Sequence, residues 1–283
     1  MSRPAACYIE PTNICNLHCP TCASRVDGRP KGHMDWNLFR KAVDQRPCAA
    51  IHMYYGGEPL LHPRIVDMVE YAERLGVCRV CTNGHLLTEA MAKAFVKMGL
   101  YELSFSLDAV ESGVYQAVRG VGLSRVMENI HMMRRVRGSA TLPRLLAEFI
   151  RFEGQPDQMT AAHEALAGQV DIIRDKRQLQ YPLLTPDFVP STRPCFQIDQ
   201  FVAVLWDGRV TPCCLDLGAQ CVVGDLNRQS MSEILDGPAM QSVYSLCRAG
   251  LQDRLVLCAH CVSADALNDG PYWGAQASPG TMA

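Results

Sequence analysis

The sequence predicts an α/β protein: a partial barrel of six strand–helix units, (β/α)6, followed by a small cysteine-rich subdomain. Short apolar segments alternate with longer amphipathic ones from residue 5 to about residue 175. That order favours a parallel sheet with right-handed crossovers. The composition then changes, and seven of the 14 cysteines lie from Cys195 onward. A second, smaller unit is therefore expected after the barrel.

The six expected strands are short, apolar and bounded by turn residues, and the expected helices between them repeat apolar residues at helical spacing. The strands are Cys7–Glu10, Ala50–Tyr55, Val77–Thr82, Glu102–Leu107, Leu145–Phe152 and Val170–Ile173. The helices are Asp35–Gln45, Pro63–Leu75, Thr88–Met98, Ser124–Arg137 and Pro156–Ala167. Parallel barrels carry their chemistry at the carboxyl ends of the strands. Motifs that directly follow these strands are therefore the candidates for a functional site.

The remaining chain divides by composition. Four prolines within residues 181–194 indicate a crossing segment without regular structure. Beyond it, Gln197–Leu205 and Arg209–Thr211 read as a hairpin, and Ser230–Ala249 reads as a helix. The expected units are the barrel at 1–180, the crossing segment at 181–194, a cysteine-rich subdomain at 195–263 and a loosely held tail at 264–283.

Charge and hydropathy exclude several classes of partner. A net charge of −2 gives no reason to expect a nucleic acid or an anionic membrane surface. No apolar run reaches the length of a membrane span, and the first residues do not form a secretion signal. The 14 cysteines are therefore expected to be metal ligands and buried thiols in a reducing cytoplasm, rather than disulfides.

Three of these cysteines, Cys15, Cys19 and Cys22, lie within eight residues directly after the first expected strand. Three thiolates can hold three corners of a four-iron cluster, and such a site leaves the fourth iron open to a substrate or cofactor. A zinc site or coincidence would use the same residue types, so the loop alone does not decide between them.

The spacing of Cys15, Cys19 and Cys22 resembles the cluster loop of the radical S-adenosylmethionine (radical SAM) superfamily. The resemblance implies a [4Fe–4S] cluster that binds S-adenosylmethionine and cleaves it to a 5′-deoxyadenosyl radical, with the cofactor supplying the difficult chemistry. It also implies a flavodoxin- or ferredoxin-type reductant. Many relatives place an aromatic residue just before the third cysteine, whereas this chain has Thr21, which leaves the adenine wall unassigned.

A glycine-rich turn, Gly56-Gly57-Glu58-Pro59, follows the second expected strand. It resembles the family turn whose backbone carbonyls and acid receive the ammonium group of the cofactor, and Tyr55 is expected to border the cofactor through its backbone. Two glycines allow close backbone approach, and the proline stiffens the exit. A plain turn before a helix is the alternative.

Polar residues also end the third and fourth expected strands. Asn83 is expected near the site, and Ser106 and Asp108 resemble the polar strand end that lies at the ribose and carboxylate. Arg119 stands where a related group of enzymes places an arginine on the methionine carboxylate, and a guanidinium suits that partner. Arg119 would look the same as a solvated residue at a helix end, and Asn83 the same in a simple turn.

The later cysteines suggest a second cluster. Cys195, Gly208 and Cys213, followed by Cys258 and Cys261, resemble the SPASM and shorter twitch subdomains of the superfamily. The resemblance implies one auxiliary [4Fe–4S] cluster with four cysteine ligands. Two cysteine pairs also describe a structural zinc site. Cys214 and Cys221 are substitute ligands.

The small size and single auxiliary cluster resemble the aminoglycoside-tailoring members of the superfamily, which include an epimerase and a dehydrogenase. We therefore expect a small polar substrate, an aminoglycoside or aminocyclitol, whose C–H stereocentre is inverted with Cys247 as hydrogen donor. Oxidation of a hydroxyl to a ketone, with Asp216 as base, is the alternative. The absence of an extra N-terminal domain argues against a peptide substrate, but a separate recognition protein could supply that role, so a peptide-modifying enzyme is a further alternative. A non-catalytic iron–sulfur electron carrier or zinc-stabilised binding protein is the hypothesis from another class.

Overall fold

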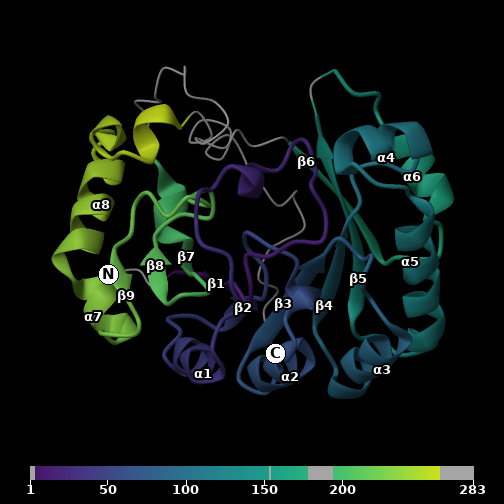
Figure 1. Cartoon of the computed structure of the whole chain (residues 1–283), viewed down its shortest axis with the longest axis horizontal. Coiled ribbons are helices and arrows are strands. Elements are labelled where there is room, and N and C mark those ends of the chain that lie inside the picture. The colour runs from purple at the N-terminus through teal and green to yellow at the C-terminus, as the bar shows by residue number, and fades with distance from the viewer. Residues whose placement is uncertain (1–3, 153, 178–193, 262–283) are drawn as a thin grey trace, which may run out of the picture.

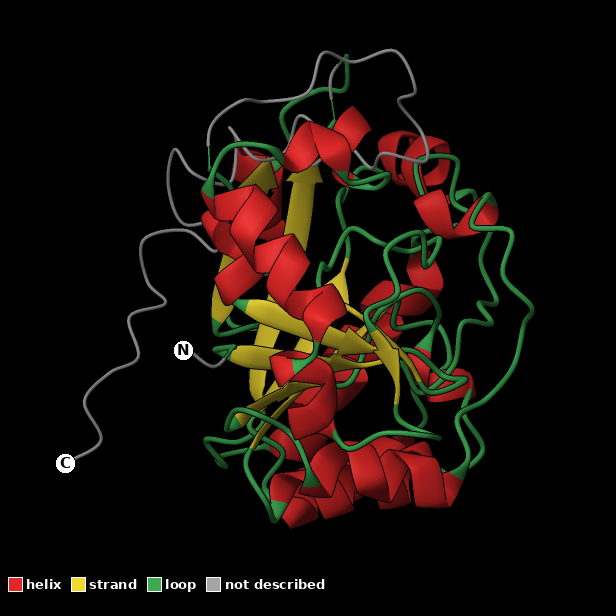
Figure 2. Ribbon diagram, turned by 90° about the vertical axis from the view of Figure 1, so that its left-hand side faces the viewer, coloured by secondary structure: helices red, strands yellow, loops and turns green. Residues whose placement is uncertain are grey.

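The strands form one curved, nine-stranded sheet in the order β6-β5-β4-β3-β2-β1-β7-β8-β9 (Figures 1 and 2). The computed structural model describes residues 4–152, 154–177 and 194–261. The first six strands pair in parallel, which confirms the predicted partial barrel. Their bounds are β1 Ala6–Ile9, β2 Ala50–His52, β3 Val77–Thr82, β4 Glu102–Ser106, β5 Arg144–Arg151 and β6 Ile172–Arg177.

Six helices cover the outer, convex side of these strands (Figure 1). They are α1 Trp36–Asp44, α2 Ile65–Glu73, α3 Glu89–Met98, α4 Ser112–Arg119, α5 Ser124–Arg137 and α6 Met159–Ala165. Their apolar faces bury Phe39, Phe95 and Tyr115 completely in the core that lies against the sheet. The core therefore sits outside the barrel, and the loops after the strands remain free to build a site at its mouth.

The predicted hairpin is present as β7 Phe201–Val204 and β8 Arg209–Thr211, with a short strand β9 at Gly224–Asp225. Its first strand begins later than the predicted Gln197, because Phe196–Asp199 form a short 3-10 helix. Strand β7 pairs in parallel with β1, so that Ala6 lies opposite Phe201 and Ile9 opposite Val204. The cysteine-rich part of the chain thus continues the barrel sheet beyond its first strand, a pairing that the hairpin pattern alone does not reveal.

Several boundaries differ from the predicted ones for local reasons. Strand β2 ends at His52 rather than at Tyr55, because the chain leaves the sheet to enter the glycine-rich turn. Strand β6 continues to Arg177, well beyond the predicted Ile173, because Arg174 and Lys176 reach Glu148 of β5 and form ion pairs. Its charged residues hide it from a search for apolar runs.

The helices differ from the predicted ones at two places. Helix α4 was not expected, although Tyr115 and Val118 give it a buried face. The single helix expected at Ser230–Ala249 is two helices, α7 Met231–Asp236 and α8 Pro238–Arg248. Proline lacks the N–H that a continuous helix needs, and it suits the first position of a new one.

Other predicted features fall outside the described residues. Apart from Pro194, the expected crossing segment at 181–194 is among them, and so is the expected tail at 264–283. In the described part of the chain, no helix has the length and apolar character needed to cross a membrane.

Candidate functional site

The loop that carries Cys15, Cys19 and Cys22 is closed at its base by side-chain hydrogen bonds. Thr12 donates through Oγ1 to the carbonyl of Gly32 at 2.7 Å. Asn13 donates to the carbonyl of Pro30 at 2.8 Å and accepts from the amide of Gly32 at 2.9 Å. These bonds hold the segment directly after β1 in a closed loop at the carboxyl end of the strand, where the barrel mouth was expected.

The glycine-rich turn packs directly against the base of that loop. A Cβ on Gly57 would lie 2.4 Å from the carbonyl oxygen of Thr12 and 2.6 Å from that of Ile14. The amide of Glu58 donates to the same Ile14 carbonyl at 2.9 Å. Only a residue without a side chain fits at Gly57, so the glycine joins the turn to the cysteine loop.

Glu58 is buried and ties the turn to the end of β3. Its Oε1 accepts from Thr82 Oγ1 at 2.6 Å and from the amide of Leu60 at 3.0 Å, and its Oε2 accepts from the amide of Asn83 at 2.8 Å. Burial raises the pKa of Glu58, against these donors, which lower it. A carboxylate offers about four acceptor sites. Three are occupied here, which leaves capacity for one further donor such as an ammonium group.

Asp108 and Arg119 form an ion pair at the ends of β4 and α4. Arg119 Nη2 lies 2.6 Å from Asp108 Oδ2, and Asp108 Oδ1 accepts from the amide of Ile150 at 2.9 Å. Asp108 adopts a left-handed backbone conformation, with φ 66°. Arg119 Nε is buried, and no acceptor among the described residues contacts it. That unpaired donor fits a negatively charged group, such as the carboxylate of S-adenosylmethionine.

One cavity of about 670 Å³ brings these features together. Every residue predicted for cofactor binding lines it except Pro59: Tyr55, Gly56, Gly57, Glu58, Asn83, Ser106, Asp108 and Arg119. The three cysteines of the loop line it as well. Asn83 donates to Asn16 Oδ1 at 2.9 Å, within the cysteine loop, so the end of β3 also contacts that loop. The donor set fits an iron–sulfur cluster with a cofactor beside it.

Sequence reasoning did not place one thiol in this cavity. The thiol of Cys81, near the end of β3, lines the cavity, and its Sγ lies 3.1 Å from Ser106 Oγ. It is also 3.8 Å from Glu148 Oε2. The alternation of inward and outward residues along β3 could have identified it, because Cys81 and Arg79 share one face of the strand.

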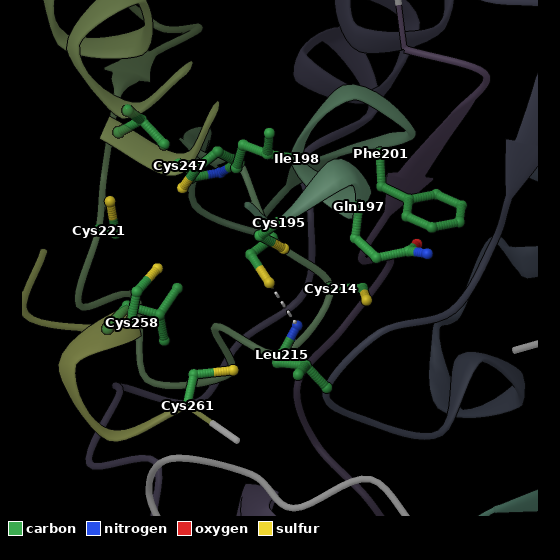
Figure 3. A pocket seen from close by; sticks show the side chains of 14 residues that line it. Cys195, Gln197, Ile198, Phe201, Cys214, Leu215, Cys221, Cys247, Cys258 and Cys261 are labelled. Atoms are coloured by element: carbon green, nitrogen blue, oxygen red, sulfur yellow. Dashed lines mark hydrogen bonds between the residues drawn. The ribbon is translucent and has the colours of Figure 1, made fainter. Parts of the chain in front are cut away.

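A second cavity is lined by all seven later cysteines (Figure 3). They are Cys195, Cys213, Cys214, Cys221, Cys247, Cys258 and Cys261. The four predicted auxiliary ligands are thus brought together, and Figure 3 shows Cys195, Cys258 and Cys261 on different sides of the cavity. No group of three or more cysteine, histidine or acidic side chains in the described ranges is arranged to hold a single metal ion.

The structure places Cys247 in this second cavity and not among the residues that line the first. Cys247 is buried near the end of α8, where its carbonyl accepts from the amide of Cys195 at 3.1 Å. A hydrogen bond between the thiols of Cys247 and Cys258 raises the pKa of Cys258. Cys247 therefore lies among the cysteines that were predicted to bind the auxiliary cluster.

Asp216, the base predicted for the alternative oxidation, lies on the loop between Cys213 and Cys221 (the auxiliary loop) and not among the residues that line the first cavity. Its carboxylate is completely buried and accepts from Thr211 Oγ1 at 2.5 Å. It also accepts from the amides of Gln220 at 2.7 Å and Cys221 at 2.9 Å. With three donors bound and no contact with the first cavity, Asp216 organises the backbone between Cys213 and Cys221.

Replacing Glu58 by glutamine is expected to weaken S-adenosylmethionine binding about tenfold or more, because a charge-assisted contact becomes a neutral one. Equilibrium dialysis under anaerobic conditions measures the affinity. Glu73→Gln is the control: Glu73 also accepts from two backbone amides, those of Cys78 at 3.2 Å and Tyr101 at 3.1 Å, but lies outside the cavity. Equal affinity in the Glu58 variant and wild type would remove Glu58 from the cofactor site.

Comparisons with known proteins agree with this geometry. The model of the radical SAM superfamily matches residues 9–144, and that of the SPASM iron–sulfur cluster-binding domain matches residues 195–262. A cofactor-modifying protein for the tungsten-containing aldehyde ferredoxin oxidoreductase of Pyrococcus furiosus is 36% identical over 108 residues, 36% of this chain and 30% of that protein. The PqqA peptide cyclase of Gluconobacter oxydans is 25% identical over 255 residues, 75% of this chain and 70% of the relative.

A second PqqA peptide cyclase, from Streptomyces rochei, is 31% identical over 124 residues, 42% of this chain and 34% of the relative. The chain thus spans about a third of the length of two of these three curated relatives.

Solved structures share the fold. BtrN, in complex with AdoMet and 2-DOIA, superposes with a TM-score of 0.61 at 18% identity and covers 93% of this chain and 94% of its own. SuiB of Streptococcus suis, bound to the precursor peptide SuiA, has a TM-score of 0.70 at 14% identity, with 95% and 74% covered. The radical SAM domain implies S-adenosylmethionine and a [4Fe–4S] cluster, and the SPASM domain implies auxiliary iron–sulfur clusters. The chain belongs to the radical SAM superfamily and carries a SPASM domain behind its partial barrel.

Proposed function

We propose that this protein is a radical SAM enzyme that oxidises a peptide substrate by removing two hydrogens from it. The observation that carries the proposal is the adjacency of the two cavities. The first cavity, lined by Cys15, Cys19 and Cys22, is called the cofactor cavity, and the second, lined by the seven later cysteines, is called the auxiliary cavity. Tyr55 lines the cofactor cavity, and its hydroxyl donates at 2.9 Å to the carbonyl of Cys213, which lines the auxiliary cavity. An electron acceptor held in the second cavity would lie next to the cofactor cavity, which favours a net oxidation.

The residues divide between three tasks. Cys15, Cys19 and Cys22 hold the cluster that binds the cofactor, and Cys195, Cys213, Cys258 and Cys261 hold the auxiliary cluster. Gly56, Gly57 and Glu58 receive the ammonium group, and Arg119, oriented by Asp108, receives the carboxylate. Asn83 and Ser106 complete the polar wall, while Pro59 ends the turn. When bound, S-adenosylmethionine and its cluster would supply the radical that removes one hydrogen atom from the substrate. The auxiliary cluster would then accept the electron that the substrate radical loses together with a proton.

The chain's own residues prepare the site for this chemistry. Burial raises the pKa of the Cys15 thiol to about 11, so cluster binding there must displace a proton. Arg119 lowers the pKa of Cys19, although burial raises it overall. The closed loop and the packed turn hold both groups of ligands in place before the cofactor arrives, which reduces the entropy lost on binding.

A peptide substrate is supported by relatives named for acting on peptides. Two of the curated relatives are PqqA peptide cyclases, and one solved structure with this fold holds a precursor peptide. The reductant would be a flavodoxin- or ferredoxin-type protein.

Redox-neutral inversion of a sugar carbon is the second candidate, and the position of Cys81 favours it. A hydrogen donor must face the substrate, and Cys81 lines the cofactor cavity whereas Cys247 does not. Burial raises the pKa of Cys81 to about 12, which keeps the thiol protonated as a donor requires. The similarity in fold to BtrN, whose structure holds 2-DOIA, is compatible with a small polar substrate.

Anaerobic turnover with dithionite and S-adenosylmethionine in D2O, against short peptides and aminoglycosides, tests these candidates. We expect release of 5′-deoxyadenosine and a peptide product two hydrogens lighter than the substrate, both measured by mass spectrometry. The expected pattern should be unchanged in Cys247→Ser with both clusters retained.

A product that instead gains one deuterium at an inverted sugar carbon would establish the second candidate. Loss of that product in Cys81→Ser, but not in Cys247→Ser, would then identify the donor. Release of 5′-deoxyadenosine would exclude a non-catalytic electron carrier, and its absence with every substrate and without one would contradict both candidates.

A further inference from the structure

Tyr55, just before the glycine-rich turn, and Gly56, the first residue of that turn, are both linked to the auxiliary loop between Cys213 and Cys221. The first link is direct: the hydroxyl of Tyr55 donates to the carbonyl of Cys213 at 2.9 Å. The same carbonyl accepts from the amide of Asp216 at 3.2 Å, inside the loop. The Cys213 peptide is therefore held from the barrel side and from the loop side.

The second link starts at Gly56 and passes through a buried ion pair. The amide of Gly56 donates to Glu10 Oε1 at 3.2 Å, and Arg29 Nη2 lies 2.7 Å from the same oxygen. Arg29 Nε donates to the carbonyl of Leu217 at 2.6 Å, within the auxiliary loop. The Glu10 and Arg29 side chains are almost completely buried, so water does not compete for these bonds.

Aromatic packing fixes the Tyr55 ring between the two cavities. Tyr8 of β1 contacts Tyr55, with ring centroids 6.1 Å apart, and also Phe201 of β7, at 5.4 Å. Phe201 lines the auxiliary cavity and Tyr55 lines the cofactor cavity. Because packing against Tyr8 restricts the Tyr55 ring, its hydroxyl has few available positions. This favours a fixed geometry for its hydrogen bond to the Cys213 carbonyl.

We propose that Tyr55 is a positioning residue for the auxiliary cluster, in that its hydroxyl orients the Cys213 peptide and so the thiolate that binds iron. The inference rests on the proposed assignment of Cys213 as a ligand. Hydrogen bonds near a cluster help to set its reduction potential. Removing a donor takes the positive end of a dipole away from a reduced, more negative cluster, and therefore lowers the potential.

Tyr55→Phe removes only the hydroxyl. In the reconstituted enzyme, anaerobic redox titration followed by electron paramagnetic resonance should show a more negative midpoint for the auxiliary cluster. Loss of its iron to a chelator should be severalfold faster.

Tyr54→Phe is the matched control, because Tyr54 lines the same cavity but its hydroxyl contacts His52 Nδ1, at 3.2 Å. It should leave the auxiliary midpoint unchanged. Tyr55→p-aminophenylalanine restores a donor at the same place and should restore both the midpoint and the rate of iron loss.

The outcomes separate the two assignments. Wild-type protein that reconstitutes only one cluster overturns the proposed auxiliary ligands, and this proposal with them. Two clusters in wild type, with an auxiliary midpoint and iron loss that Tyr55→Phe leaves unchanged, overturn the role of Tyr55 alone.

Discussion

Replacing Cys15, Cys19 and Cys22 together by alanine is expected to remove about half of the protein's iron and to abolish cleavage of S-adenosylmethionine. All three thiols line the cofactor cavity, and no other cysteine that lines it lies on the same loop. Without them the cofactor has no cluster to reduce it, so the loss of activity should be complete rather than partial. Iron analysis and chromatography of 5′-deoxyadenosine measure both effects.

The complementary replacement of Cys195, Cys213, Cys258 and Cys261 should remove the other half of the iron. Cys48→Ala is the control, because Cys48 lines neither cavity and its thiol donates to the carbonyl of Ala50 at 3.4 Å. Zinc in place of iron in the second set, after anaerobic purification, would contradict the auxiliary cluster. Full cofactor cleavage by the first triple variant would contradict the whole assignment.

Replacing Gly57 by alanine is expected to have the second-largest effect, a loss of stability of about 3 kcal/mol or more together with loss of cofactor binding. The new Cβ would lie 2.4 Å from a backbone oxygen of Thr12, which cannot rotate away as a side chain would. The clash can be relieved only if the turn and the cysteine loop move apart. The contact between them positions the cysteines that bind the cluster and the residues that bind the cofactor. Urea unfolding and equilibrium dialysis measure the two losses.

Gly113→Ala provides the comparison for that experiment. Gly113 lies in the first turn of α4, and a Cβ added there would have no other group within 4 Å. Alanine is a better helix former than glycine, so the free energy of unfolding of this variant should lie within about 1 kcal/mol of that of wild type. The variant should also bind the cofactor normally. If Gly57→Ala behaves in the same way, the turn does not depend on close packing against Thr12.

The sequence predicted those parts of the site that are local in the chain. Cys15, Cys19 and Cys22 stand on one loop, and the glycine turn directly follows a strand, so spacing and strand order place them at one edge of the sheet. The need for glycine at position 57 could not be predicted from the sequence, because the pairing of β1 with β2 is what brings the carbonyl of Thr12 against it.

The parts that sequence could not predict depend on contacts between distant segments. Cys247 stands in a helix and Cys81 follows Cys78 by three positions in a strand, but only the fold assigns one to the auxiliary cavity and the other to the cofactor cavity. The charged end of β6 was missed because its partner, Glu148, lies on another strand. Helix α8 begins anew at Pro238, and that proline is a local signal for a helix start that the sequence does contain.

The pairing of β7 with β1 has a consequence for how this protein assembles. Strand β1 has β2 on one side and must wait for Phe201–Val204 to fill the other. During synthesis, most of the chain emerges while that edge of β1 still presents unpaired backbone amides and carbonyls, the kind of edge that recruits other chains. The part of the chain that begins at Phe201 also carries the loops predicted to bind the auxiliary cluster. The late pairing of β7 with β1 therefore both covers the exposed edge of β1 and brings those loops into place.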